Sequence, residues 1–278
     1  MALNLKSITR GQAVRAPRIL LYSSHGVGKS TFGASADAPI FIQTEDGADE
    51  LGVARFPLAA THQDVVDAIG VLYNEPHDFR TVVVDTIDWA DQLIWAAINA
   101  KHSAADLAYG KGAVIAAEYW RGLLDGLSAL RNDRGMAVIL LAHCQVKRFD
   151  SPEVEPFDRY MPKLQERSSQ LLQEWCDAVL FANYKMFTTA TDVGFNKKVT
   201  RGVSTGERVM YTSERPAYLA KNRYNLPHEL PLSWAALVGA MGAGVAAAQF
   251  TPAAPAANTP AAPAANTSAA PAAEIEKA

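Results

Sequence analysis

The chain has 278 residues, a formal net charge of −3 at pH 7 and 49% hydrophobic residues. A slightly acidic chain has no global basic field that would attract nucleic acid, so any polyanion must be bound by local segments. The N-terminus lacks a signal-peptide pattern and no apolar run has membrane-spanning length, so we expect a cytoplasmic protein without a membrane partner.

Composition divides the chain into three parts. Residues 1–17 are mixed and are predicted to form an N-terminal arm, residues 18–244 to form the folded core, and residues 245–278 to form a disordered Ala/Pro-rich tail. Regular proline prevents a continuous helix in this tail and favours an extended spacer. A second interpretation is a tether whose end, residues 274–278, docks on a partner. Cys144 and Cys176 are predicted to be reduced core thiols rather than a disulfide.

The first predicted strand, 18–22, leads into the sequence Ser23-Ser24-His25-Gly26-Val27-Gly28-Lys29-Ser30-Thr31 and a short helix. Strand, glycine turn and helix start are the context of a phosphate-binding P-loop, although the full motif has glycine where this chain has Ser23. Glycines let backbone N–H groups surround the β-phosphate, Lys29 can reach the β- and γ-phosphates, and the Ser30 hydroxyl can ligate Mg²⁺. The predicted nucleotide-binding residues are Ser24, His25, Gly26, Val27, Gly28, Lys29, Ser30 and Thr31, and the predicted cofactors are ATP and Mg²⁺.

Later strands end in polar residues that parallel pairing would bring to the same edge of the sheet. Strand 39–43 is followed by Glu45, a candidate base for the attacking water, or else a solvated loop acid. Strand 79–86 contains Asp85 at its carboxyl end, where a carboxylate can hold the Mg²⁺ shell. Strand 137–143 ends in His143 and is followed by Gln145, and either could sense the γ-phosphate, unless His143 is simply a satisfied histidine at a strand end.

Helices are predicted near 62–73, 87–100, 114–131, 164–175 and 233–241, with a fifth parallel strand at 177–182. Segments 101–112 and 146–163 lack a sustained period and are predicted to be loops, the second a mobile one. Shorter β-like runs at 208–212 and 217–220 predict an antiparallel addition to the sheet. The pattern therefore predicts an α/β fold with a mostly parallel central sheet flanked by helices.

The P-loop, Glu45, Asp85 and the His143/Gln145 pair together resemble the RecA-like core ATPases, and the run Ala220-Lys221-Asn222-Arg223-Tyr224 adds to this resemblance. The stretches around Tyr109-Gly110-Lys111-Gly112 and Glu174-Trp175-Cys176 are similar to phage-encoded RecA-like ATPases of the single-strand annealing type. The resemblance implies a RecA-like P-loop core whose subunits form a ring or filament with ATP at the interfaces. It also implies that Lys221 and Arg223 act on the neighbouring subunit's ATP. The candidate catalytic residues are Glu45, Lys29, His143, Gln145, Lys221 and Arg223.

In RecA-like proteins, loops at the positions of 101–112 and 146–163 hold single-stranded DNA. Backbone-binding cations and stacking aromatic side chains are present in both segments, although nearby acids dilute the charge and leave a solvated loop as an alternative. The candidate DNA contacts are Lys101, Lys111, Lys147, Arg148, Arg159 and Lys163. The resemblance implies a phage ATPase of the host cytoplasm that anneals or recombines single strands, with its tail as a contact for single-strand-binding protein. The alternative is a RecA-fold switch or motor that acts on a protein, such as a helicase-loading factor.

Overall fold

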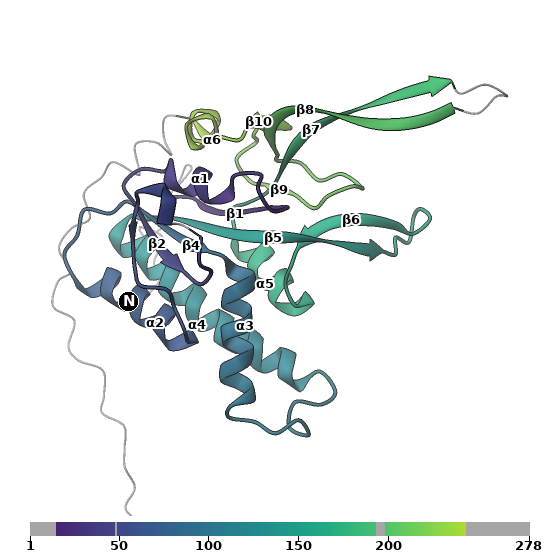
Figure 1. The fold of residues 1–278 in the computed structure, drawn as a ribbon. Helices are drawn as coiled ribbons and strands as arrows, with labels where there is room; N and C mark the ends of the chain where they lie inside the picture. The colour runs from purple at the N-terminus through teal and green to yellow at the C-terminus, as the bar shows by residue number, and fades with distance from the viewer. Residues whose placement is uncertain (1–14, 48, 193–197, 243–278) are drawn as a thin grey trace, which may run out of the picture.

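A computed structural model describes residues 15–47, 49–192 and 198–242 (Figure 1). Most of the predicted arm and the entire predicted tail, with its docking tip and its contact for single-strand-binding protein, therefore lie outside the described residues. Ala16 and Pro17, which the sequence assigned to the arm, are buried against the core.

A ten-stranded sheet forms the centre of the molecule, and six neighbouring strands in it are parallel. In spatial order these are β7 (Ala178–Asp192), β1 (Arg18–Ser23), β5 (Ala137–Phe149), β4 (Thr81–Asp85), β2 (Pro39–Gln43) and β3 (Ala54–Arg55). Near-continuous apolar runs suit such strands because helices cover both faces of the sheet. The predicted α/β fold with a mostly parallel sheet is confirmed.

The antiparallel addition extends the sheet beyond β7. Its strands are β8 (Lys198–Tyr211) beside β7, β10 (Glu229–Pro231) beside β8, and the two-residue β9 (Lys221–Asn222) beside the start of β7. The prediction of a strand at 217–220 is wrong, because Tyr218 makes only isolated bridges there. The apolar residues of this segment serve packing rather than strand pairing: the Tyr218 ring stacks on Phe181 and Tyr211 at centroid distances of 5.2 and 4.7 Å.

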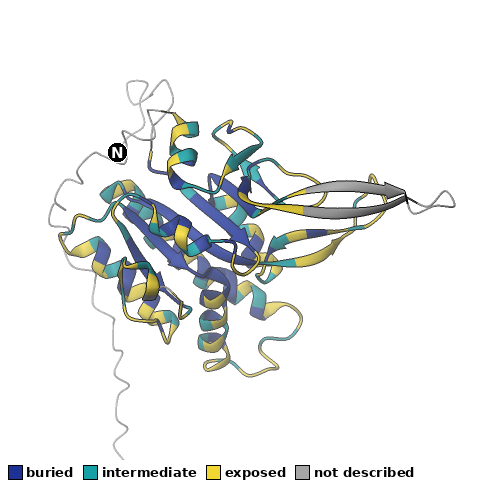
Figure 2. Ribbon diagram, turned by 45° about the horizontal axis from the view of Figure 1, so that its top comes forward, coloured by how far each residue is buried: buried dark blue, intermediate teal, exposed yellow. Residues whose placement is uncertain are grey.

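Helices cover the two faces unequally. One face carries α2 (His62–Asn74), α3 (Ile87–Asn99), α4 (Lys111–Arg134) and α5 (Glu166–Trp175), and the other carries α1 (Lys29–Ala34) and α6 (Trp234–Met241). A short 3₁₀ turn, η2 (Asp49–Leu51), follows β2. The strands between the helix layers are almost wholly buried (Figure 2). Within the described part of the chain, no helix combines the length and apolar character needed to cross a bilayer.

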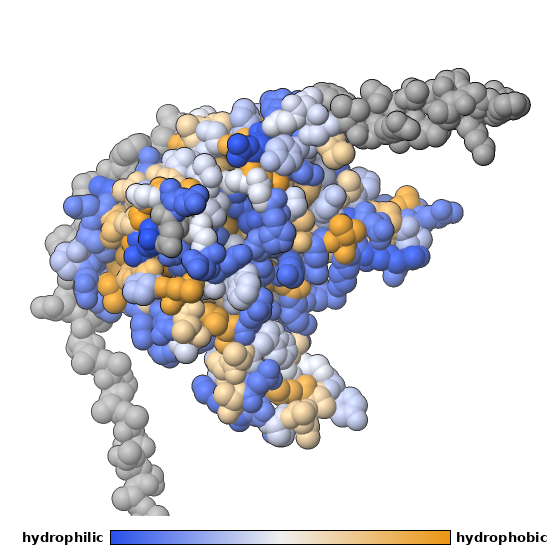
Figure 3. Space-filling view, in the orientation of Figure 1, coloured by the Kyte–Doolittle hydropathy of each residue, from blue (hydrophilic) through white to orange (hydrophobic). Residues whose placement is uncertain are grey.

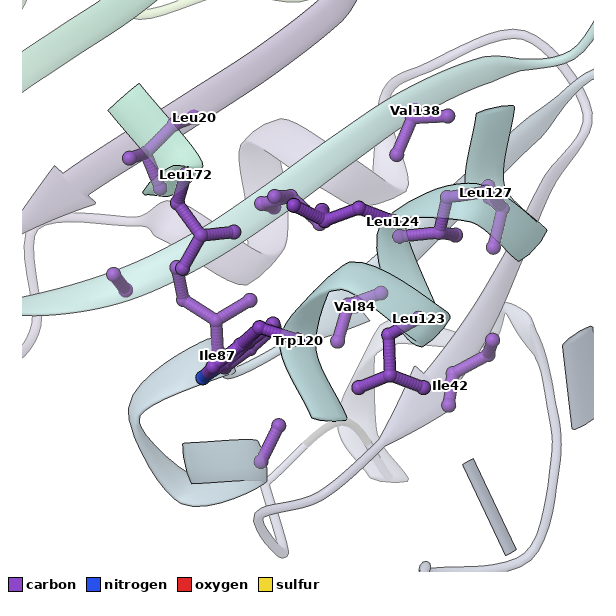
Figure 4. Packing of buried hydrophobic residues seen from close by; sticks show 14 of the residues in the cluster. Leu20, Ile42, Val84, Ile87, Trp120, Leu123, Leu124, Leu127, Val138 and Leu172 are labelled. Carbon is purple, nitrogen blue, oxygen red and sulfur yellow. The ribbon is translucent and has the colours of Figure 1, made fainter. Parts of the chain in front are cut away.

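The larger core lies between the sheet and α2–α5, and its centre is Trp120 of α4 (Figure 4). The Trp120 ring is buried among side chains that include Ile87 and Leu172, and its indole N–H donates to the Asp91 carboxylate at 2.7 Å. Each large side chain that is fully buried in this way contributes about 1.5–3 kcal/mol of transfer free energy. Both cysteines are free thiols as predicted; Cys176 is fully buried, which raises the pKa of its thiol to about 12, and Cys144 is partly buried.

The predicted mobile loop at 146–163 is wrong, because these residues form an antiparallel hairpin. Strand β5 continues past the sheet edge to Phe149 and pairs with β6 (Phe157–Pro162). The Phe149 and Phe157 rings face each other at 5.5 Å across the two strands. Both faces of this projecting hairpin carry polar residues, so the apolar alternation that normally indicates a strand is weak. In the other predicted loop, turns fill residues 101–110, and α4 begins at Lys111, before the predicted helix start at 114.

Candidate functional site

The turn after β1 has the backbone that phosphate binding requires. Gly26 (φ +75°) and Gly28 (φ +111°) are both in left-handed conformations, and Gly28 directly precedes the first residue of α1, Lys29. This turn borders a cavity of about 350 Å³ at the carboxyl edge of the sheet. Six of the eight predicted nucleotide-binding residues line the cavity: His25, Gly26, Gly28, Lys29, Ser30 and Thr31. Of the other two, Ser24 accepts a hydrogen bond from Lys29 Nζ through its carbonyl at 3.4 Å, and Val27 is buried.

The two predicted Mg²⁺ ligands are in contact. The Ser30 hydroxyl donates to Asp85 Oδ2 at 2.6 Å, which joins the start of α1 to the end of β4. Burial raises the pKa of the Asp85 carboxyl, the Ser30 hydrogen bond lowers it, and the charge of Glu45 raises it again, with a net upward shift. Burial lowers the pKa of Lys29, while Asp85 and Asp88 oppose that shift. A hydroxyl and a carboxylate with raised pKa fit a hard cation, because a bound Mg²⁺ would stabilise the ionised form.

Glu45 and His143 meet across the same cavity. Glu45 Oε2 accepts a hydrogen bond from the Thr86 hydroxyl at 3.2 Å and lies 3.7 Å from His143 Nδ1. The other partner of His143 is Asp88, whose two carboxylate oxygens contact the His143 backbone N–H and Nδ1, each at 2.9 Å. Burial would raise the pKa of Asp88, but these hydrogen bonds from His143 outweigh it and lower the pKa. Asp88 therefore holds the imidazole in place beside Glu45, and the His25 ring packs against it at 4.3 Å.

The cavity wall carries more negative than positive side chains. Its carboxylates are Glu45, Asp46, Glu50 and Asp85, whereas its permanently charged cations are Lys29 and Arg208. A triphosphate would meet net repulsion from such a wall unless a divalent cation came with it. The cavity therefore fits a metal–nucleotide complex better than a free nucleotide.

A family model described as an AAA domain matches residues 15–224, which is more than half of the chain. The chain belongs to this AAA-domain family. No curated protein matches the sequence. Among solved structures, the crystal structure of the RadB recombinase is similar at 19% identity, over 74% of this chain and 86% of that chain, with a TM-score of 0.41. The family confirms the prediction of a P-loop ATPase core.

Three predicted catalytic residues of this AAA domain lie away from the cavity. Gln145 points toward β6, where its amide donates to the Pro162 carbonyl at 3.2 Å. Lys221 and Arg223 lie at the opposite edge of the sheet, beside the amino end of β7. Lys221 Nζ donates to the carbonyls of Gln173, Glu174 and Cys176 at 2.7–3.0 Å and so caps the C-terminus of α5. Of the two candidate sensors, only His143 lines the nucleotide cavity.

The predicted DNA contacts of the AAA domain fall into two separate groups. Lys101 and Lys111 flank the turns between α3 and α4, and Lys101 Nζ contacts the Tyr119 hydroxyl at 3.0 Å. The rest belong to the β5–β6 hairpin or follow it directly: Lys147, Arg148, Arg159 and Lys163. Lys147 and Arg148 are exposed but paired with Glu166 and Asp150, and Lys163 is exposed. Arg159 has only 4% of its side chain exposed and pairs with Glu214, so it is not the surface cation that was predicted.

The sequence analysis did not single out Thr86 and Arg208, which line the cavity, or Asp88, which contacts His143 beside it. Thr86 and Asp88 lie one and three residues after Asp85, so a search for polar residues beside that carboxylate would have found them. Arg208 comes from β8, more than 170 residues after the P-loop. No local pattern predicts that contact, because it depends on how β8 pairs with β7.

Proposed function

We propose that this AAA domain hydrolyses Mg²⁺–ATP and that the nucleotide state controls the binding of single-stranded DNA by the β5–β6 hairpin. The observation that carries the proposal is the continuity of β5. His143 contacts the nucleotide cavity on this strand, and Phe149, six residues later, lies on the projecting hairpin. A change at the γ-phosphate position has a short, hydrogen-bonded path to the hairpin.

The roles in hydrolysis follow from the contacts in the cavity. Lys29 and the glycine turn would bind the phosphates, and the Ser30 hydroxyl and the Asp85 carboxylate would hold Mg²⁺. The bound Mg²⁺ would neutralise charge on the phosphates. Glu45 is the general base that orients and deprotonates water, and Thr86 and His143 fix the orientation of its carboxylate.

The DNA proposal rests on exposed aromatic side chains beside cations. Phe149 and Tyr160 are 37% and 36% exposed on the hairpin, and Tyr109 is fully exposed at the turn before α4. The hairpin projects from the body of the molecule with hydrophobic and hydrophilic side chains intermixed (Figure 3). Bases would stack on such rings while Lys147, Arg148 and Lys163 neutralise phosphates.

We further propose annealing or homologous recombination as the biological role, and a phage origin. Both proposals rest on the resemblance to phage-encoded RecA-like ATPases.

In an oligomer, Arg223 is the better of the two proposed trans-acting cations. The side chain of Arg223 is 53% exposed, and its contacts with Asp177 and with the Glu174 carbonyl are both long, at 3.5 Å. Lys221 instead donates to three carbonyls at 2.7–3.0 Å. We propose that Arg223 reaches a neighbouring subunit's ATP, where it stabilises charge in the transition state.

The test is the binding of fluorescent oligothymidylate without nucleotide, with ADP and with a non-hydrolysable ATP analogue, at two salt concentrations. We expect the ATP analogue to tighten binding and salt to weaken it, since phosphate contacts release counterions. Lys29→Ala should remove the nucleotide effect, and Glu45→Gln should retain it while turnover falls. Phe149→Ala should weaken DNA binding, with Val71→Ala on α2, 39% exposed, as the matched control.

A second candidate function, action on a protein partner, keeps the same ATPase site and uses the hairpin to grip a polypeptide. The pairing of Lys147 and Arg148 with acids favours this alternative, because paired cations attract phosphate less strongly. An intact ATPase without DNA binding at low salt would reject the DNA proposal and favour the alternative.

A further inference from the structure

The base of the β7–β8 ribbon touches the glycine turn at two points. The Tyr184 hydroxyl donates to the Gly26 carbonyl, and Arg208 Nη1 donates to the Val27 carbonyl, each at 3.4 Å. Tyr184 on β7 and Arg208 on β8 are direct partners in the strand register, so both contacts come from one cross-strand pair. The ribbon extends from this base away from the body of the molecule (Figure 1).

The guanidinium of Arg208 has a free charge beside the phosphate cavity. Among the described residues its polar contact is the single long hydrogen bond to Val27, and no carboxylate lies within ion-pair distance. The neighbouring Lys185 differs, since it forms an ion pair with Glu229. A guanidinium without an ion pair that donates one long hydrogen bond to a carbonyl is ready to donate to an anion instead.

Arg208 borders the part of the cavity that the glycine turn and Lys29 also line. Arg208 lines the same cavity as Lys29 and Ser30. Its Nη1 lies 2.8 Å from where a Cβ on Gly28 would be, so the guanidinium lies directly against the glycine turn. Residues that approach Gly28 this closely adjoin the turn that surrounds the β-phosphate in a P-loop.

We infer that Arg208 is a phosphate ligand that acts within its own subunit, together with Lys29, and that nucleotide binding transfers its guanidinium from the Val27 carbonyl to phosphate oxygens. The inference rests on the proposed function, because it requires a nucleotide in this cavity. It extends that function by making the β7–β8 ribbon part of the nucleotide site. Arg208 would then be the second permanent cation, after Lys29, that binds phosphate in a cavity rich in carboxylates.

The test compares the affinities of wild type, Arg208→Gln and Arg208→Lys for Mg²⁺–ATP and Mg²⁺–tripolyphosphate by calorimetry. We expect Arg208→Gln to weaken both ligands by about tenfold, the scale of one charged hydrogen bond, and Arg208→Lys to weaken them less. Arg121→Gln, on the solvent side of α4, is the matched control and should bind as wild type does. Thermal melting checks that each variant is folded.

The outcomes separate this inference from the proposed function. If wild type binds and Arg208→Gln binds equally well, the inference is overturned and the proposed function stands. If only ATP binding weakens, Arg208 contacts the base and the phosphate assignment is overturned. If wild type binds neither ligand, both fail. Mixing Arg208→Gln with Lys29→Ala should leave nucleotide affinity low in the Arg208→Gln subunits; restored affinity would show action between subunits and overturn the assignment.

Discussion

Asp85 and Asp177 are equally buried, at 7% exposure, yet their pKa values shift in opposite directions. Asp85 ends β4 at the nucleotide edge of the sheet, and Asp177 precedes β7 at the opposite edge. Burial raises the pKa of Asp85, and the nearby Glu45 adds to the shift. Burial would also raise the pKa of Asp177, but hydrogen bonds and charges from Arg18 and Arg131 outweigh it and lower the pKa.

The difference lies in the partners. The Asp177 carboxylate forms ion pairs with Arg18 at 2.9 Å and Arg131 at 3.0 Å and accepts a hydrogen bond from the Tyr224 hydroxyl at 3.2 Å. Its charge is therefore compensated. The Asp85 carboxylate accepts its hydrogen bond from a neutral group, the Ser30 hydroxyl. The compensated Asp177 joins β1, α4 and the segment after β9. The charge of Asp85 is only partly compensated, by Lys29 and His143, and a bound cation would stabilise its ionised form. Equal burial therefore does not imply an equal role.

The largest effect is expected on stability, when the compensated carboxylate of Asp177 is removed. Asp177→Ala should lower the free energy of unfolding by about 3–5 kcal/mol, because two partly buried arginines and a tyrosine lose their acceptor. Urea unfolding measures the change, and ATPase turnover per folded molecule should stay the same. Asp150→Ala, which breaks an exposed pair with Arg148, is the control and should not measurably change stability. A loss below 1 kcal/mol for Asp177→Ala would contradict the role of Asp177 as an anchor.

The second largest effect is expected at the nucleotide edge, where loss of Asp85 should affect activity and not stability. Asp85→Asn should lower ATP turnover by about a hundredfold, since an amide binds Mg²⁺ poorly and the metal's charge stabilisation is lost. The affinity for Mg²⁺–ATP should fall while the stability of the nucleotide-free protein does not. Steady-state kinetics over a range of Mg²⁺ concentrations measures the effect. Unchanged turnover at low Mg²⁺ would remove Asp85 from the metal site.

A third buried carboxylate sharpens the distinction, because Asp88 lies at the nucleotide edge but its pKa is lowered. The comparison assigns Asp88 to positioning, through His143, rather than to ligand binding. Asp88→Asn should lower turnover by about tenfold with little change in KM, because the ring loses its charged acceptor but the amide oxygen can still accept from the His143 backbone. A rise in KM with unchanged kcat would instead place Asp88 in nucleotide binding.

The carboxyl-edge site was largely predictable from sequence because its parts are local. The glycine turn, Asp85 and Glu45 each follow a buried strand, and parallel pairing brings strand ends together. Tertiary pairing was not predictable by the same means. The hairpin at 146–163 lacks an apolar face, and Arg208 and Asp177 depend on contacts between residues more than 100 positions apart. The pairing of the buried Arg159 with Glu214, 55 positions later, was missed because it also depends on the tertiary fold.

The smallest expected effect is a pH dependence that distinguishes the two carboxylates. The pKa of Asp85 is higher in the folded than in the unfolded protein, so the folded state binds this proton more tightly and gains stability as pH falls from neutral through that raised pKa. Compared with Asp85→Asn, nucleotide-free wild type should therefore gain stability on the order of 1 kcal/mol between pH 7 and about pH 4.

For Asp177 the sign is opposite: its contribution to stability is present above about pH 4 and is lost as pH falls below that value, through its lowered pKa. Urea unfolding of wild type and both variants from pH 7 to 3.5 measures the differences, in which other titrating groups cancel. Differences of the same sign for Asp85 and Asp177 would mean that burial, and not the partners, determines how each carboxylate titrates.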